Sequence, residues 1–400
     1  MKEGLLKTIS ISQLTPGMYV SKIIEQTGDI KLKSEGKVTS QDIVEVLKAR
    51  GVKRLIIDGS KAFDIKAPDS HVSEPALVTQ NTVQKKITTP FYKEIQQAEK
   101  LHAQGKVIQK SLLASVEKGQ PFDEAIPKAF SQKLVESINR NPDALLCLTQ
   151  IREKDDYLLE HSLNVAILLA NFGQFIGMDE AQVNDLAYAG FLHDMGKIRI
   201  PGEILHKPGR LTDDEMDIMK QHVMFGVQAL EEAKIAPFLI NIVSEHHERL
   251  DGKGYPAGKA ETQISREGRM LAIADMYDAL TAQRCYKAGM PSQKAMKLLL
   301  QGAPHQLDSQ LVQMFIKCMG VYPVGSLVKL SNNKLAMVAE QTASPLTPIV
   351  KVFYSVTGDH FLEPKDLNLA HEKHLSIESS VLASDYKIDF NSFFERSISI

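Results

Sequence analysis

Histidine is the residue type whose positions first suggest chemistry. Of the twelve histidines in the 400-residue chain, six lie between positions 161 and 247, namely His161, His193, His206, His222, His246 and His247. Neutral imidazole is a common ligand of transition-metal ions, and several imidazoles can converge on one ion. We therefore expect several of these side chains to meet in the folded chain.

The dipeptide His193-Asp194 brings two ligand types together. Imidazole and carboxylate suit a borderline transition metal, and the two oxygens of a carboxylate can bridge two ions. The surrounding residues predict a helix, on which Lys197, four residues after His193, would lie on the same face. Taken alone, the dipeptide favours a plain surface pair, so its interpretation depends on the other candidates.

Asp275 and the pair His246-His247 are such candidates. Asp275 lies in the apolar run "MLAIADMYDAL", where an ionised carboxylate is costly to bury without a cation or hydrogen-bond donors. A salt bridge to Arg269 or Arg284 is the alternative. Adjacent histidines point about 100° apart on a helix, so both can reach one ion only near a helix end or across a site open to both.

The two histidines lead into the glycine-rich stretch "HHERLDGKGYPAG". Glycines allow the backbone to turn tightly, and Pro256 limits that freedom. We expect this loop to fold beside the site, with Tyr255 lining a substrate pocket or facing a partner. A plain structural turn is the alternative for the tyrosine.

Helical periodicity surrounds these residues. Apolar positions recur at spacings of three and four in "HSLNVAILLANFG", "VNDLAYAGFLHDMGK" and "SREGRMLAIADMYDALT", which predicts amphipathic helices. We predict an all-helical domain at 143–320, preceded by connecting helices at 91–142. After it, period-two alternation in "NKLAMVAEQ" and "TPIVKVFYSV" predicts a β-rich extension at 321–400.

A separate small domain is predicted at the N-terminus. The stretch "ISISQLTPGMYVSKI" predicts two strands around a turn, "TSQDIVEVLKARG" a helix that ends at Gly51, and "VKRLIID" a third strand. Residues 1–65 are thus expected to form an α+β domain. The Pro-, Ser- and Thr-containing stretch at 66–90 is typical of a linker. The predicted fold class is mainly α.

Composition argues against several classes of protein. The formal net charge is −2 and basic residues are scattered, which argues against bulk nucleic-acid binding. Cys147, Cys285 and Cys318 stand far apart, as in proteins of a reducing compartment. We found no apolar run of about 18 residues, the length that suggests a membrane helix. We expect a cytoplasmic protein that does not enter the membrane.

Five motifs in order resemble the HD-GYP subgroup of HD-domain metal phosphohydrolases. They are "HSLNVA", "FLHDMGKIRIPGEILHKPGRL", "HVMFGVQAL", "HHERLDGKGYPAG" and "IADMYDALTAQRCYK". The resemblance covers residues 143–320 and implies an all-helical HD-type metallohydrolase core. The N-terminal segment is similar to a small domain of unknown role that often precedes HD-GYP domains.

The resemblance implies a binuclear centre of two divalent transition-metal ions, Fe or Mn, with Asp194 as the bridge. The implied metal ligands are His161, His193, Asp194, His222, His246, His247 and Asp275. The implied substrate contacts are Lys197, Arg284, Lys287 and Tyr255. Asp194 and Lys197 are the implied catalytic residues.

Two positions test how far the resemblance carries. Arg284 lies nine residues after Asp275, so a straight helix would turn it away, and we expect the chain to leave the helix near Thr281. One branch of the family takes a third metal through a Glu where this chain has Tyr157, so we expect two metals. The neighbouring charges of Asp156 and Glu160 are more simply solvated.

The implied activity is hydrolysis of a cyclic dinucleotide of bacterial signalling. The substrate is cyclic di-GMP, opened to pGpG and in some members on to GMP, or 3′,3′-cyclic GMP-AMP. The Gly-Tyr-Pro loop is implicated in contacts with diguanylate cyclase domains, and the sequence leaves a homodimer open. A non-catalytic sensor of cyclic dinucleotides or docking module for cyclases is the alternative, and a general HD-domain nucleotide phosphatase ranks last.

Overall fold

The chain forms two compact units, Met1–Val78 and Thr79–Ile400, each with its own hydrophobic core. The computed structural model describes residues 6–15, 18–27, 36–38, 44, 47–48, 51–58, 87–150, 157–282, 289–342, 344–372, 374–386 and 388. Most of the predicted linker at 66–90 lies outside these residues. The boundaries between the five predicted segments therefore stay predictions.

The first unit contains a four-stranded antiparallel sheet. In spatial order its strands are β1 (Leu6–Ser10), β4 (Val52–Asp58), β2 (Tyr19–Gln26) and β3 (Gly36–Lys37). The sequence predicted the three longer strands of this sheet, β1, β2 and β4. The helix expected before Gly51 falls mostly outside the described residues, but Gly51 has the positive φ of +78° that suits a helix C-terminus.

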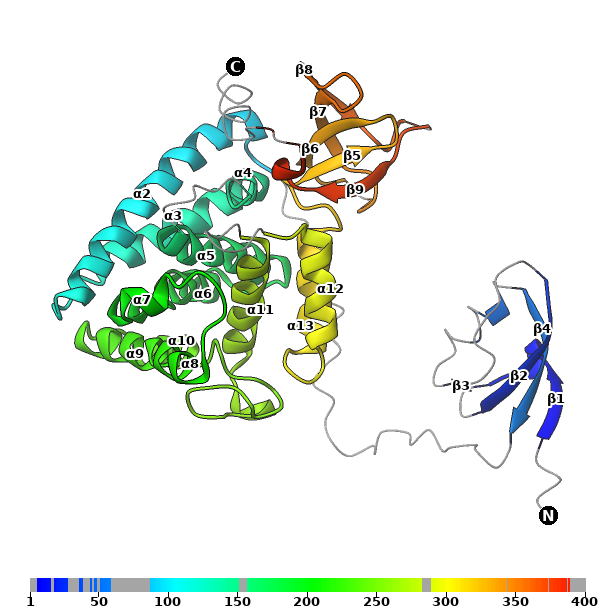
Figure 1. Ribbon diagram of the computed structural model, residues 1–400, viewed down its shortest axis with the longest axis horizontal. Helices are drawn as coiled ribbons and strands as arrows, with labels where there is room; N and C mark the ends of the chain where they lie inside the picture. The colour runs from blue at the N-terminus through cyan, green and yellow to red at the C-terminus, as the bar shows by residue number, and fades with distance from the viewer. Residues whose placement is uncertain are drawn as a thin grey trace. The chain divides into compact units, whose positions relative to one another are not determined.

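The described residues of the second unit between 91 and 319 are mainly helical (Figure 1). Its helices are α2 (Phe91–Glu117), α3 (Ala125–Arg140), α4 (Pro142–Leu148), α5 (Tyr157–Phe175), α6 (Glu180–Leu192), α7 (Gly202–Leu205), α8 (Asp213–Lys220), α9 (His222–Glu232), α10 (Pro237–Ser244), α11 (Arg266–Thr281), α12 (Ser292–Gly302) and α13 (Ser309–Met319). A mainly α fold is therefore confirmed.

Helix α5 lies at the centre of this unit. Its residues 160–172 are all buried, as expected of a helix that is apolar on nearly every side. Helix α6 packs against α5 and begins with a capping box, in which the Asp179 side chain accepts from the Gln182 N–H at 2.8 Å. A histidine on α5 is consequently held deep in the core.

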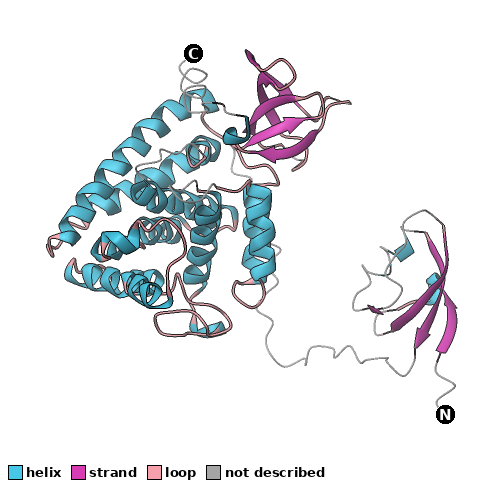
Figure 2. Cartoon of the chain, in the orientation of Figure 1, coloured by secondary structure: helices cyan, strands magenta, loops and turns pink. Residues whose placement is uncertain are grey.

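The C-terminal strands form a five-stranded antiparallel sheet (Figure 2). In spatial order they are β8 (His360–Asn368), β7 (Ile349–Ser355), β6 (Lys334–Glu340), β5 (Leu327–Leu330) and β9 (Ile377–Val381). Buried Val328 and Phe353 belong to the same core cluster as Phe315 of α13, so the sheet packs on the helices. Among the described residues, no helix combines the length and apolarity that crossing a membrane requires.

Candidate metal centre

Four predicted ligands from three helical segments meet in the core, and we call them the aspartate-rich cluster: His161, His193, Asp194 and Asp275. The Nε2 atoms of His161 and His193 each lie 3.3 Å from Asp194 Oδ2. His161 Nε2 also lies 3.0 Å from Asp275 Oδ1. All four residues are buried.

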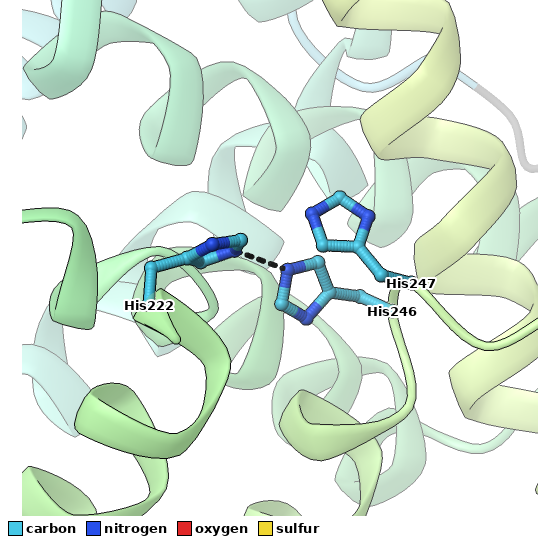
Figure 3. Close-up of side chains that lie close together, drawn as sticks. All are labelled: His222, His246 and His247. Carbon is cyan, nitrogen blue, oxygen red and sulfur yellow. Dashed lines mark hydrogen bonds between the residues drawn. The ribbon is translucent and has the colours of Figure 1, made fainter. Parts of the chain in front are cut away.

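The three remaining predicted ligands form a second group, the imidazole cluster: His222, His246 and His247. Figure 3 shows the rings of His222, from α9, and His246, after α10, turned toward each other, with Nε2 atoms 3.3 Å apart. The rings of His246 and His247 have centroids 4.1 Å apart. Helix α10 ends at Ser244, so the expectation that the paired histidines need a helix end is confirmed.

Asp194 lies between the two clusters. Its Oδ2 faces His161 and His193, while Oδ1 lies 3.6 Å from His222 Nε2 and 3.9 Å from His246 Nε2. One carboxylate therefore reaches both groups through different oxygens, which is the arrangement a bridging ligand requires.

The same tautomer is imposed on four of the histidines. The Nδ1 atoms of His193, His222 and His246 lie 2.8, 2.7 and 2.6 Å from the carbonyl oxygens of Gly190, Met219 and Val243. His161 Nδ1 lies 2.7 Å from Asp278 Oδ2. Because these acceptors require Nδ1 to carry a proton, a neutral ring presents the Nε2 lone pair to the site.

The buried polar atoms of the two clusters indicate that their residues could hold metal ions. Within the described part of the chain, His193 Nε2 and Asp194 Oδ1 are buried and have no hydrogen-bond partner. His222 and His246 direct two Nε2 lone pairs at each other, an arrangement that a cation would relieve. Buried polar groups seldom lack partners without a reason such as a bound ion, so these residues suit a metal centre.

The electrostatics of the two clusters differ. Burial, with the neighbouring charges around it, lowers the pKa of His222 to about 4, and in the same way lowers the pKa of His247 to about 3. For His161, burial acts to lower the pKa, but hydrogen bonds to Asp275 and Asp278 outweigh it and raise the pKa to about 9. The imidazole cluster is therefore neutral at pH 7, whereas His161 carries a proton without metal.

The segment after His193 departs from the predicted helix. Helix α6 ends at Leu192, and a 3-10 helix, η3 (Met195–Arg199), follows. Lys197 contacts Asp194, the residue that directly precedes η3. A Cβ on Gly196 would lie 1.9 Å from the His222 carbonyl oxygen, so only glycine lets η3 approach α9 this closely.

The glycine-rich loop folds against the imidazole cluster as expected. The ring of Tyr255 lies 4.8 Å from that of His247, centroid to centroid, and the Tyr255 N–H donates to the His247 carbonyl at 3.1 Å. A Cβ on Gly254 would lie 2.5 Å from Glu248 Cα, which explains the glycine there. Tyr255 therefore borders the site, with its pKa raised by burial and by nearby carboxylates.

Several other predictions are resolved by this geometry. Helix α11 ends at Thr281, as expected, although Arg284 and Lys287 lie outside the described residues. Arg269 pairs with Asp308 at 3.1 Å, so the alternative in which it neutralises Asp275 is wrong.

The surroundings of the first ligand on α5 were predicted less well. Glu160 is buried and lies 3.5 Å from Lys106 on α2, so the expectation of a solvated charge was wrong. Asp156 and the side chain of Tyr157 lie outside the described residues, so the two-metal expectation stays a prediction. His206 is exposed and outside both clusters.

Asp278 is the residue near the site that the sequence did not single out. It is buried on α11, three residues after Asp275, and accepts from His161 Nδ1. A second carboxylate one turn further along an apolar helix was the available signal. Such carboxylate-histidine pairs orient ligand imidazoles and raise their basicity.

Comparison with known proteins identifies the family of the chain. A model of the HD domain matches residues 138–311, and a model of a domain of unknown function (DUF3391) matches residues 6–125. A cyclic di-GMP phosphodiesterase of Pseudomonas aeruginosa is 34% identical over 357 residues, covering 88% of this chain and 86% of that protein. The chain belongs to the HD-GYP family of metal phosphohydrolases.

Other HD-GYP relatives match shorter parts of the chain. A 3′3′-cGAMP-specific phosphodiesterase of Vibrio cholerae is 35% identical over 159 residues, which are 39% of this chain and 30% of that protein. The solved structure of an HDGYP protein from Bdellovibrio bacteriovorus covers 78% of this chain and 98% of its own, with 19% identity and a TM-score of 0.48. The family expected from the five motifs is confirmed.

Proposed function

We propose that this chain is a metal-dependent phosphodiesterase that hydrolyses a cyclic dinucleotide. The observation that carries the proposal is the shared orientation of four histidines, whose Nδ1 atoms face oxygen acceptors and whose Nε2 atoms surround the two oxygens of Asp194. The relatives named above support the substrate class, because their names specify cyclic di-GMP and 3′3′-cGAMP.

Each cluster is proposed to hold one divalent transition-metal ion, Fe or Mn, with Asp194 shared between them. The ligands would be His161, His193 and Asp275 on one side, and His222, His246 and His247 on the other. Two such ions, when bound, supply an acidified water and neutralise charge on phosphate oxygens. The carboxylates of Asp194 and Asp275 would balance only part of the charge of two divalent ions. The loaded site would therefore keep a net positive charge that attracts an anionic substrate.

Lys197 is proposed to stabilise the transition state. Its ammonium group is held at the site by contact with Asp194, and its side chain is only 16% exposed. In so water-poor a place, a fixed positive charge acts strongly on the developing charge of the phosphate. Tyr255 would border the bound dinucleotide, and Arg284 and Lys287 are proposed to bind its non-bridging oxygens.

The wider context of the enzyme is proposed on the family resemblance. We place it in the cytoplasm, a reducing compartment that suits its widely spaced cysteines. The Gly-Tyr-Pro loop packs on the imidazole cluster, so a diguanylate cyclase domain that bound this loop would contact a wall of the site. A homodimer is compatible with this arrangement.

Product analysis tests the function. Protein loaded with Fe²⁺ or Mn²⁺ is incubated with cyclic di-GMP or 3′,3′-cyclic GMP-AMP, and products are separated by chromatography. A linear dinucleotide with a 5′-phosphate should appear before any mononucleotide, since one ring phosphate is cut first. The second cut should be slower, because the new terminal phosphate competes for the metals. Tight binding of either ring without cleavage over hours would instead favour the sensor function.

A further inference from the structure

Helix α2 contributes no predicted metal ligand, yet one of its faces contacts segments that carry them. In Figure 1 it runs along the helical part of the second unit, from the end near α4 toward α7. Gly105, Gln109 and Val116 follow one another at spacings of four and seven residues, so they share a face of the helix, and Lys106 lies about 100° from Gly105 at the edge of that face. Each makes a close contact described below.

Gln109 makes the most buried of these contacts. Its side chain is 1% exposed, and its Nε2 donates to the carbonyl oxygen of Phe191. Phe191 lies in the last turn of α6, where backbone carbonyls have no intrahelical donor. The hydrogen bond therefore fixes the end of α6, two residues before His193 and three before Asp194.

Two further polar contacts reach the same side of the site. Lys106 Nζ lies 3.5 Å from Glu160 Oε1, next to His161. The Val116 carbonyl accepts from Arg199 Nε at 3.3 Å, two residues after Lys197. These contacts hold the segments on either side of Asp194 as well as the first turns of α5.

Gly105 sets the distance between α2 and the core. A Cβ there would lie 2.6 Å from Phe130 Cζ and 2.9 Å from Leu163 Cδ1. Because Leu163 is two residues after His161, the closeness of α2 to α5 is part of the same support. A segment that belongs to none of the five ligand-bearing motifs thus fixes the backbone beside three ligands.

We propose that Gln109 is a positioning residue for the aspartate-rich cluster, with Arg199 as a weaker second contact to the same helix. The proposal rests on the proposed function, because it assumes that the cluster binds an ion. Its effect should fall mainly on the aspartate-rich cluster, because the contacts reach the segments of His161 and His193, which belong to that cluster alone, whereas His246 and His247 follow α10. Asp194 is shared, so binding at the other site should weaken less. Loss of the donor should weaken one metal site more than the other.

Gln109→Met tests the proposal directly. Methionine has similar length and helix propensity but no N–H donor, so packing is largely kept. In titrations of metal-free protein with Mn²⁺, we expect one of the two sites to bind roughly 10–100-fold more weakly, the usual size of losing support around a ligand. At low Mn²⁺ the kcat should fall and be regained with excess Mn²⁺, while KM for the dinucleotide is unchanged.

Gln104→Met is the matched control, because Gln104 lies on the exposed side of α2 and should titrate like wild type. Should Gln109→Met fail to fold by circular dichroism, Arg199→Met replaces it. That side chain is 20% exposed, and its loss should weaken the same site several-fold. A folded Gln109→Met, or failing that Arg199→Met, that binds both ions like the control overturns the proposal. Wild-type protein that neither binds Mn²⁺ nor hydrolyses a cyclic dinucleotide would refute the proposed function instead.

Discussion

The two clusters use the same imidazole ligand in opposite electrostatic surroundings. His161 lies between Asp275 and Asp278, and these carboxylates raise its pKa to about 9. His222 is buried and His247 is partly buried among other imidazoles, and their pKa values fall to about 4 and 3. Without metal, one cluster holds a proton in the place of a cation, and the other is neutral.

This difference suggests distinct properties for the two ions. An ion entering the aspartate-rich cluster must displace a proton, but it meets carboxylates that balance its charge. An ion entering the imidazole cluster meets ready lone pairs and, in His247, a side chain that is 25% exposed. We therefore expect pH-dependent binding at the first cluster, and pH-independent binding with easier access from solvent at the second.

Replacing the shared aspartate should abolish metal binding at both clusters. In Asp194→Ala both clusters lose a ligand oxygen, so metal content and hydrolysis should fall below detection. Elemental analysis and a product assay measure the two effects. Asp185→Ala, on the preceding helix α6 and outside both clusters, is the control. Wild-type turnover in Asp194→Ala would mean that the His-Asp pair is merely structural.

Lys197→Ala should separate chemistry from metal binding. The ammonium group is not a ligand, so both ions should remain, while turnover slows by on the order of a hundredfold or more, the scale of one preorganised electrostatic contact. Turnover at saturating substrate and metal content are measured together. Lys220→Ala, at an exposed lysine of α8, should change neither. Collapse of the metal content would show that Lys197 supports the fold of the site.

Asp278→Ala should affect only the aspartate-rich cluster. The Nδ1 of His161 loses its carboxylate partner. The affinity for the ion in this cluster should fall by roughly 10–100-fold, and the affinity for the other ion should not change. A two-site Mn²⁺ titration measures this. Asp366→Ala, at an exposed aspartate of β8, provides the comparison. Equal weakening of both ions would mean that the clusters do not act separately.

The pH dependence of metal affinity gives the smallest but most characteristic effect. Below the pKa of His161, near 9, binding at the aspartate-rich cluster releases one proton, so affinity should rise about tenfold per pH unit up to that value. The imidazole cluster, whose pKa values lie at about 4 and 3, should bind independently of pH above about 5. Isothermal titration at several pH values measures both. Two parallel pH profiles would contradict the assigned charges.

The sequence was informative where a backbone pattern alone dictates geometry. The seven ligand candidates came from the resemblance to five motifs, and the structure brings their side chains together. The expectation that Arg284 faces the site, combined with helical phase, predicted that the chain leaves the helix near Thr281, where α11 ends. The strands near residues 327–355 followed from their period-two alternation. In each case the signal lies within a few neighbouring residues.

Contacts between distant segments were not predictable in this way. The break after Leu192 depends on the packing of Gly196 against α9, and the burial of Glu160 depends on Lys106 of α2. The role of Gln109 depends on the carbonyl of a residue 82 positions away. None of these pairings has a local pattern, because a side chain's partner is decided by how helices pack.

Metal stoichiometry tests the central claim most directly. The account predicts that protein saturated with Fe²⁺ or Mn²⁺ and freed of excess ion holds about two ions per chain, and that Asp194→Ala, treated identically, holds neither tightly. Elemental analysis with a protein assay on the same sample gives the ratio. One tightly held ion per chain, three of them, or two that persist in Asp194→Ala would contradict two clusters joined by a single carboxylate.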